Sequence, residues 1–248
     1  MPVAPSQRMQ MTVGVRIHAA LMSMAALTAA AVVPGPANAS RGGCVVAKGG
    51  KVVAQNSYGL VYVRGGRFFG CSSARGKVKA LPQQGTLKVR YNGEVKTGSS
   101  VVESGPATAG RYVAYGVHWT SSEGGGGAAG PSQTARVIVF DLSAGKTKHA
   151  PKPDDGPAPY IQDLVVKANG SVAWMAQSGA GALAPTRSLM KFDTASGAAT
   201  RLDADDGEYG PHRIEQGSLA LSIDGSRVYW TAYDRSESDP LYLSAPFH

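Results

Sequence analysis

Residues 161–202 read IQDLVVKANGSVAWMAQSGAGALAPTRSLMKFDTASGAATRL, and the fold class can be inferred from them. The dipeptide Asn169-Gly170 lies between two short apolar runs, a strong local signal for a β-hairpin with a type I′ turn. Short runs of this kind, separated by turn residues, predict four strands joined as an antiparallel meander. The predicted strands are Ile161–Lys167, Ser171–Met175, Ser188–Phe192 and Ala198–Leu202.

The same pattern recurs along the chain. A glycine directly precedes a short apolar strand at four positions, with spacings of 60, 60 and 55 residues: Gly50, Gly110, Gly170 and Gly225. A turn motif, in which a cysteine or phenylalanine is followed five residues later by glycine, recurs at Cys71–Gly76, Phe140–Gly145 and Phe192–Gly197. An Asp-Asp-Gly motif recurs 51 residues apart, at 154–156 and 205–207. Motifs that recur in one order at this period predict a chain built from repeated units.

One such meander cannot bury both of its faces, and radial stacking into a β-propeller solves this problem. The chain resembles secreted bacterial β-propeller proteins with TolB-like or quinoprotein-like repeats. The resemblance rests on VIVFDLSAGK at Val137–Lys146 and on a weaker copy at Leu189–Gly197. It implies an all-β fold, a propeller of about four four-stranded antiparallel blades, and it is not specific to one activity. The tryptophan that follows this turn in quinoprotein repeats is absent here, so a quinone cofactor is not supported.

The first 39 residues have the pattern of a secretory signal peptide. Arg8 and Arg16 precede an apolar run, Ala19–Val33, and Ala37-Asn38-Ala39 fits a cleavage site. The run is shorter than the about 20 residues that a membrane-spanning helix needs. We therefore predict cleavage near Ala39, a secreted protein without stable membrane insertion, and one β-propeller domain over residues 40–248. The predicted repeats cover approximately residues 44–98, 99–155, 156–206 and 207–248.

The chain contains two cysteines, Cys44 and Cys71. Export places both in an oxidising compartment, and no other pairing exists, so we predict a Cys44–Cys71 disulfide. The last repeat supplies three strands, Ser218–Ile223, Arg227–Tyr233 and Leu241–Ser244. We predict that Cys44–Ala47 pairs with them as the missing fourth strand and so joins the two ends of the domain.

Charge is unevenly distributed along the chain. Residues 41–96 contain eleven lysines and arginines but one acid, Glu94, whereas residues 97–248 contain twelve against sixteen acids. The basic residues of 41–96 therefore predict contact with an anionic surface, such as a cell-wall polymer or phospholipid headgroups, although a simply solvated surface is an alternative. Nucleic acid is disfavoured because no aromatic residues alternate with the lysines.

Clustered acids mark the other candidate site. The predicted turns within each meander are tight, while the remaining connections are long and lie on the opposite side. Asp154, Asp155, Asp205 and Asp206 lie in these connections, and we predict that they bind a cationic or metal-bridged ligand, although simple solvation of aspartates in turns is an alternative. The residues around Asp205 and Asp206 do not place ligands at the positions that an EF-hand calcium loop requires, so we predict no metal site or other cofactor. A calcium site of looser geometry remains an alternative. Changing all four to Asn should abolish a ligand or calcium response without unfolding the protein.

Local catalytic motifs are absent from the sequence: it has no G-x-S-x-G, H-E-x-x-H, P-loop or post-strand G-x-G-x-x-G motif. We therefore assign no catalytic residues. The favoured function is an extracellular β-propeller binding module for a protein, glycan or cell-envelope ligand. The alternative is a metal-dependent propeller hydrolase or lactonase whose site converges from several blades.

Overall fold

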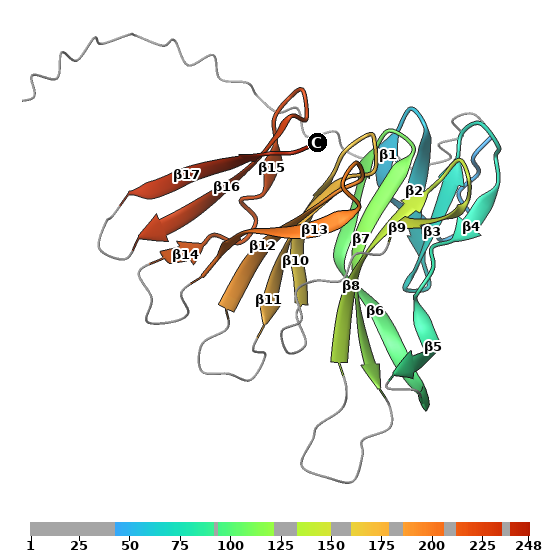
Figure 1. Cartoon of the computed structure of the whole chain (residues 1–248). Helices are drawn as coiled ribbons and strands as arrows, with labels where there is room; N and C mark the ends of the chain where they lie inside the picture. The colour runs from blue at the N-terminus through green and yellow to red at the C-terminus, as the bar shows by residue number, and fades with distance from the viewer. Residues whose placement is uncertain are drawn as a thin grey trace, which may run out of the picture. The chain divides into compact units, whose positions relative to one another are not determined.

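The computed structural model describes residues 43–91, 94–121, 133–149, 160–178, 186–205, 212–234 and 239–248. Every regular element in these residues is a β-strand, and the strands form four antiparallel sheets (Figure 1). The predicted all-β class is therefore confirmed. Within the described residues, no helix has the length and apolarity to cross a membrane. The predicted signal peptide lies outside the described residues.

The four sheets are numbered here in chain order, and the third matches the predicted meander strand for strand. Its order is β10-β11-β12-β13, with antiparallel pairing throughout. The strands are β10 (Tyr160–Val166), β11 (Val172–Ser178), β12 (Thr186–Asp193) and β13 (Ala198–Ala204).

The turn type of its first hairpin differs from the prediction. Gly170 has φ +91°, but Asn169 has no positive φ, and a type I′ turn requires a positive φ at both central residues. Gly170 N donates to Lys167 O at 2.9 Å, and Lys167 N donates to Ser171 O at 2.8 Å. The loop is therefore a three-residue hairpin connection with glycine at its left-handed position.

The first sheet is a second four-stranded meander, in the order β1-β2-β3-β4. Its strands are β1 (Lys51–Asn56), β2 (Gly59–Arg64), β3 (Arg67–Ser72) and β4 (Val78–Ala80). The second sheet has five strands in chain order, and it begins inside the first predicted repeat. They are β5 (Gly85–Tyr91), β6 (Glu94–Ala109), β7 (Tyr112–Ser121), β8 (Gln133–Asp141) and β9 (Lys146–His149). The predicted boundary at residue 98 falls within β6, because this strand is rich in Ser, Thr and Gly and gave no apolar signal.

The fourth sheet centres on β16. Two short strands pair with one of its edges, and a longer strand pairs with the other along its length. The strands are β14 (His212–Ile214), β15 (Ala220–Leu221), β16 (Arg227–Asp234) and β17 (Pro240–Pro246). β14 and β15 thus form one interrupted strand beside β16, and the predicted strand at 218–223 corresponds to its second part, β15.

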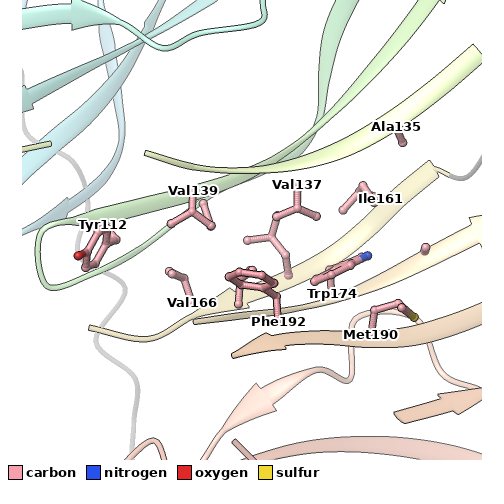
Figure 2. Close-up of a cluster of buried hydrophobic side chains, with 13 residues drawn as sticks. Tyr112, Ala135, Val137, Val139, Ile161, Val166, Trp174, Met190 and Phe192 are labelled. Atoms are coloured by element: carbon pink, nitrogen blue, oxygen red, sulfur yellow. The ribbon is translucent and has the colours of Figure 1, made fainter. Parts of the chain in front are cut away.

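Three hydrophobic clusters lie between consecutive sheets, because the central strands bury both faces. In β11, Trp174 packs against the second sheet, while its neighbours Ala173 and Met175 pack against the fourth. In β7, Tyr112 and Ala114 face the third sheet, and alternate residues face the first. Side chains alternate between faces along a strand, so a strand covered on both sides reads as an unbroken apolar run. Figure 2 shows the cluster between the second and third sheets.

The Cys44–Cys71 disulfide is present, with its Cα atoms 5.9 Å apart. Cys44 is fully buried and packs with Leu60 and Tyr62 of β2, with Val46 and Ala47 beside them. Leu60 and Tyr62 point away from Val61, which contacts the second sheet. Residues 44–47 therefore cover the outer face of the first sheet. This differs from the predicted clasp: among the described residues, β17 has β16 as its strand neighbour.

The C-terminal residues, not the N-terminal ones, connect the third and fourth sheets. Phe247 is fully buried between them. Lys167 Nζ donates to Phe247 O at 2.6 Å, and Lys191 Nζ donates to Pro246 O at 2.9 Å. His248 N donates to Asp193 Oδ1 at 3.0 Å. The last three residues of the chain thus pack against the preceding sheet.

Candidate binding sites

Of the four predicted acidic site residues, the structure describes Asp205; Asp154, Asp155 and Asp206 lie outside the described residues. The Asp205 side chain is 3% exposed. Its carboxylate accepts hydrogen bonds from the backbone N–H groups of Ile214 and Arg187, and Arg187 Nη1 lies 3.8 Å from Oδ2. Asp205 therefore connects β12 to β14, across the junction between the third and fourth sheets.

Arg187 extends this polar network over the third sheet. Its Nη1 donates to Ile214 O at 3.0 Å and its Nε donates to Gln162 Oε1 at 3.3 Å. Gln162 in turn donates to Gln177 on the neighbouring strand. These bonds join β10, β11, β12 and β14, so the network serves to align strands.

A histidine and an aspartate form a close pair beside this network. His212 Nε2 lies 3.0 and 3.1 Å from the two carboxylate oxygens of Asp203, and Trp230 Nε1 donates to Asp203 Oδ2 at 2.6 Å. A His–Asp pair orients a general base in hydrolases, but it then needs a hydroxyl or thiol nucleophile at the histidine. In the described part of the chain, no hydroxyl or thiol has a recorded hydrogen bond to His212. The same residues include no group of three or more His, Cys, Asp or Glu side chains placed to hold a metal ion.

The most distinctive site is a cavity of about 130 Å³ between the β3–β4 turn and the β8–β9 turn. Three cationic side chains line it: Arg75 in the first turn, Lys77 just before β4, and Lys79 within β4. Lys79 Nζ donates to Gly145 O of the opposite turn at 3.0 Å. The remaining lining residues are Gly70, Ser72, Phe140, Leu142, Ser143 and Gly145. We call this the basic cavity.

Its origin becomes clear by comparison with the third sheet. Ser72 and Asp193 each accept a 2.9 Å backbone hydrogen bond from the glycine four residues later, so they open equivalent turns. Two residues before each stand Gly70 and Lys191. In the third sheet, Lys191 and Asp193 reach the C-terminal segment Pro246–His248. In the first sheet, Gly70 and Ser72 carry no such long side chain. Leu142, directly after β8 of the second sheet, approaches Gly70 instead, since a Cβ atom there would lie 2.6 Å from Leu142 Cδ2, and the cavity lies beside this contact.

A larger cavity of about 380 Å³ lies between the β10–β11 and β15–β16 turns. Lys167 and Asp224 of opposite charge line it, beside the fully exposed Ile223. Hydrogen bonds from the Ser222 hydroxyl and from Ser226 lower the pKa of Asp224 to about 2. This mixture of charge selects no single class of ligand.

Both cavities are lined by tight turns, whereas the predicted binding face consists of long connections that fall largely outside the described residues. Sequence reasoning found the basic charge of residues 41–96 but not the cavity. The available signal was Lys77-Val78-Lys79 after a turn glycine, because residues two apart on a strand project from the same face. The partner turn at Ser143–Gly145 could be placed beside them only by tertiary structure.

Comparisons with known proteins do not assign a family. No protein-family model matches the chain, and no curated protein matches its sequence. Among solved structures, Hsv2 of Kluyveromyces lactis is similar at 11% identity over 82% of this chain and 75% of that chain, with a TM-score of 0.29. The extracellular domain of the putative one component system BT4673 of B. thetaiotaomicron is similar at 9% identity, covering 77% of this chain and 27% of that chain, with a TM-score of 0.25.

Proposed function

We propose that this chain is a secreted β-propeller-type binding module that attaches to an anionic ligand of the cell envelope through its first sheet. The four sheets act as blades of the propeller, and the clusters between consecutive sheets support this interpretation. The disulfide supports export, because structural disulfides persist in oxidising compartments.

The observation that carries the proposal is the charge of the first sheet and of its flanking segments. Residues 41–93 contain no aspartate or glutamate. The cationic side chains described between residues 43 and 80 are all exposed: Lys48, Lys51, Arg64, Arg67, Arg75, Lys77 and Lys79. A surface whose charges are all positive raises the local concentration of an anionic partner. The distance over which it attracts that partner decreases as the salt concentration rises.

The test compares two triple variants that each remove three exposed cations. Lys51→Gln, Arg64→Gln and Arg67→Gln remove charge from the first sheet, whereas Lys146→Gln, Lys148→Gln and Arg213→Gln remove it elsewhere. Binding to immobilised dextran sulfate is measured at low salt, with uncharged dextran as the blank. We expect the first-sheet variant to bind about tenfold more weakly or worse, since each cation near an anionic surface contributes about 1 kcal/mol.

The control variant should bind within about twofold of the parent, and added salt should weaken every variant. Equal losses in the two triple variants would show that net charge alone governs binding, and the proposal would be wrong. Melting temperatures of all three proteins exclude unfolding as the cause.

A further inference from the structure

The basic cavity has features that a general basic surface lacks. Its cations come from one short segment, Arg75 to Lys79, and line one cavity rather than spreading over the sheet. Lys77 and Lys79 are two residues apart at an edge strand, and both line the cavity, while Val78 between them is 40% exposed. The strand alternation therefore aims both ammonium groups toward the same volume.

Lys79 is held in place by a contact across the cavity. Its Nζ donates to Gly145 O at 3.0 Å, which uses one of the three ammonium N–H donors. The other two remain for a ligand or water. The turn that supplies Gly145 is itself fixed, because Gly145 N donates to Asp141 O at 2.7 Å. One lysine is thus positioned before any ligand arrives, which reduces the entropy cost of binding.

The carboxylate of Asp141, which precedes the opposite turn, does not neutralise the site. Asp141 is absent from the lining and is buried; it accepts a 2.6 Å hydrogen bond from Ser143 Oγ and lies 3.3 Å from Arg111 Nε. Its charge is therefore offset by Arg111. Among the residues that the structure describes, no aspartate or glutamate lines the cavity, so three cationic groups face it without an anionic partner in this part of its wall.

The size of the cavity limits what it can hold. The cavity, of about 130 Å³, is large enough to hold several water molecules and opens to solvent. A phosphate group, with one phosphorus and four oxygen atoms, fits within this volume, and the remainder of a larger ligand would extend through the opening. Buried Phe140 and Leu142 form an apolar wall, which limits solvent on that side.

We propose that the basic cavity is a recognition site for a phosphate monoester group, with Arg75, Lys77 and Lys79 contacting its oxygens and the remainder of the ligand outside the cavity. This inference rests on the proposed function and names its ligand class. Three cations match a phosphate monoester, which carries close to two negative charges at neutral pH, better than a sulfate ester or carboxylate with one. Charged donors to phosphate oxygens also form the stronger class of hydrogen bonds.

The experiment is calorimetric titration of the full, oxidised chain with glucose 6-phosphate at low salt, beside glucose 6-sulfate as the matched monoanion. We expect saturable one-to-one binding of the phosphate ester, about tenfold tighter than the sulfate ester. Lys77→Ala with Lys79→Ala should weaken phosphate binding about tenfold or more, because it removes two charged donors. Arg75→Ala, in the exposed turn, should weaken it independently.

The second sheet offers a matched control. Lys146 and Lys148 stand at the equivalent positions of β9, five and seven residues after Asp141, as Lys77 and Lys79 stand after Ser72, and they do not line the cavity. Lys146→Ala with Lys148→Ala should leave phosphate affinity within about twofold of the parent. Equal losses in the two double variants, equal affinity for the two esters, or no saturable binding by the folded parent would each overturn the cavity assignment.

The two proposals fail separately. If the parent protein binds dextran sulfate through its first sheet but does not bind glucose 6-phosphate, the binding module is supported and the cavity assignment is refuted. If the parent binds glucose 6-phosphate but the two triple variants bind dextran sulfate equally, the cavity assignment is supported and the proposed function of the first sheet is refuted. Melting temperatures identify any variant that has lost its fold.

Discussion

The backbone N–H of His248 donates a 3.0 Å hydrogen bond to the carboxylate of Asp193, 55 residues earlier in the chain. This contact places the adjacent Phe247 between the third and fourth sheets, where its side chain is fully buried. Phe247→Ala should lower the free energy of unfolding by about 3–5 kcal/mol because it leaves a large cavity. His248→Ala keeps the backbone N–H and should cost under about 0.5 kcal/mol. Urea denaturation measures both, and equal effects would contradict the role of Phe247.

Close approach of the second and third sheets depends on Gly116 in β7. A Cβ atom added there would lie 2.5 Å from Ile161 Cβ, which cannot rotate away. Gly116→Ala should therefore destabilise the protein by about 1–3 kcal/mol or more. Gly105→Ala is the control, since its new Cβ would meet no atom within 4 Å and its φ is not positive. Equal melting temperatures of the two variants in a thermal scan would refute this packing argument.

Asp141 should make the stability of the second sheet depend on acid pH. Burial alone would raise the pKa of Asp141, but hydrogen bonds from Ser143 and Ala144, with Arg111 nearby, together lower that pKa below its ordinary value. A carboxylate with a depressed folded-state pKa stabilises the fold above its unfolded pKa of about 3.9, and this contribution is lost as the pH falls through the folded value.

We expect Asp141→Asn to cost about 1 kcal/mol at pH 6, through the loss of charged hydrogen bonds. The gap between parent and variant should narrow below about pH 4, as the parent carboxylate is protonated. Urea denaturation at several pH values gives this gap directly. A gap that stays constant down to pH 2 would mean that the Asp141 charge does not contribute.

The contacts of Asp205 change how the acidic connections should be tested. Asp205→Asn should cost about 1–3 kcal/mol, because the buried carboxylate accepts from Ile214 N and Arg187 N beside an arginine. Asp239→Asn, at an exposed acid, should cost under about 0.5 kcal/mol. Chemical denaturation compares the two.

A test of the acidic site therefore uses Asp154→Asn, Asp155→Asn and Asp206→Asn together, without Asp205→Asn, and calorimetric titration with calcium. If that triple variant retains any calcium response of the parent, these three acids are not its ligands. An Asp205→Asn variant as stable as the parent would show instead that the Asp205 network is dispensable.

Much of the fold was accessible from local patterns. The third sheet could be predicted because Asn169-Gly170 marks a hairpin and each strand is bounded by turn residues. The turn type was wrong because Gly170 alone takes the left-handed conformation, with Asn169 in an ordinary one. In the turn after β8, Ala144 N donates to Asp141 Oδ1 at 2.9 Å, a local bond that an aspartate in a turn commonly accepts. The equivalent Asp193 instead accepts from His248 N, a contact that no local pattern encodes.

The sites were harder to predict, because they depend on which turns meet in space. Net charge indicated a basic first sheet, but the basic cavity also requires Gly145 from a turn 66 residues beyond Lys79. Asp205 was predicted to bind a ligand, since a short acidic motif gives no sign that Arg187 and Ile214 will enclose its carboxylate.

The arrangement of the core in three clusters, each shared by two consecutive sheets, has a consequence for how the protein loosens. Strands covered on both sides, such as β7 and β11, should resist amide hydrogen exchange most strongly, while the first and fourth sheets open with less energy. The first sheet, which carries the cations, is then a partly independent cooperative unit, with the Cys44–Cys71 disulfide restricting its opening. Reduction of the disulfide should therefore loosen the first sheet before the central pair unfolds, so the attachment proposed for that sheet would respond to the redox state of the surroundings before overall stability does.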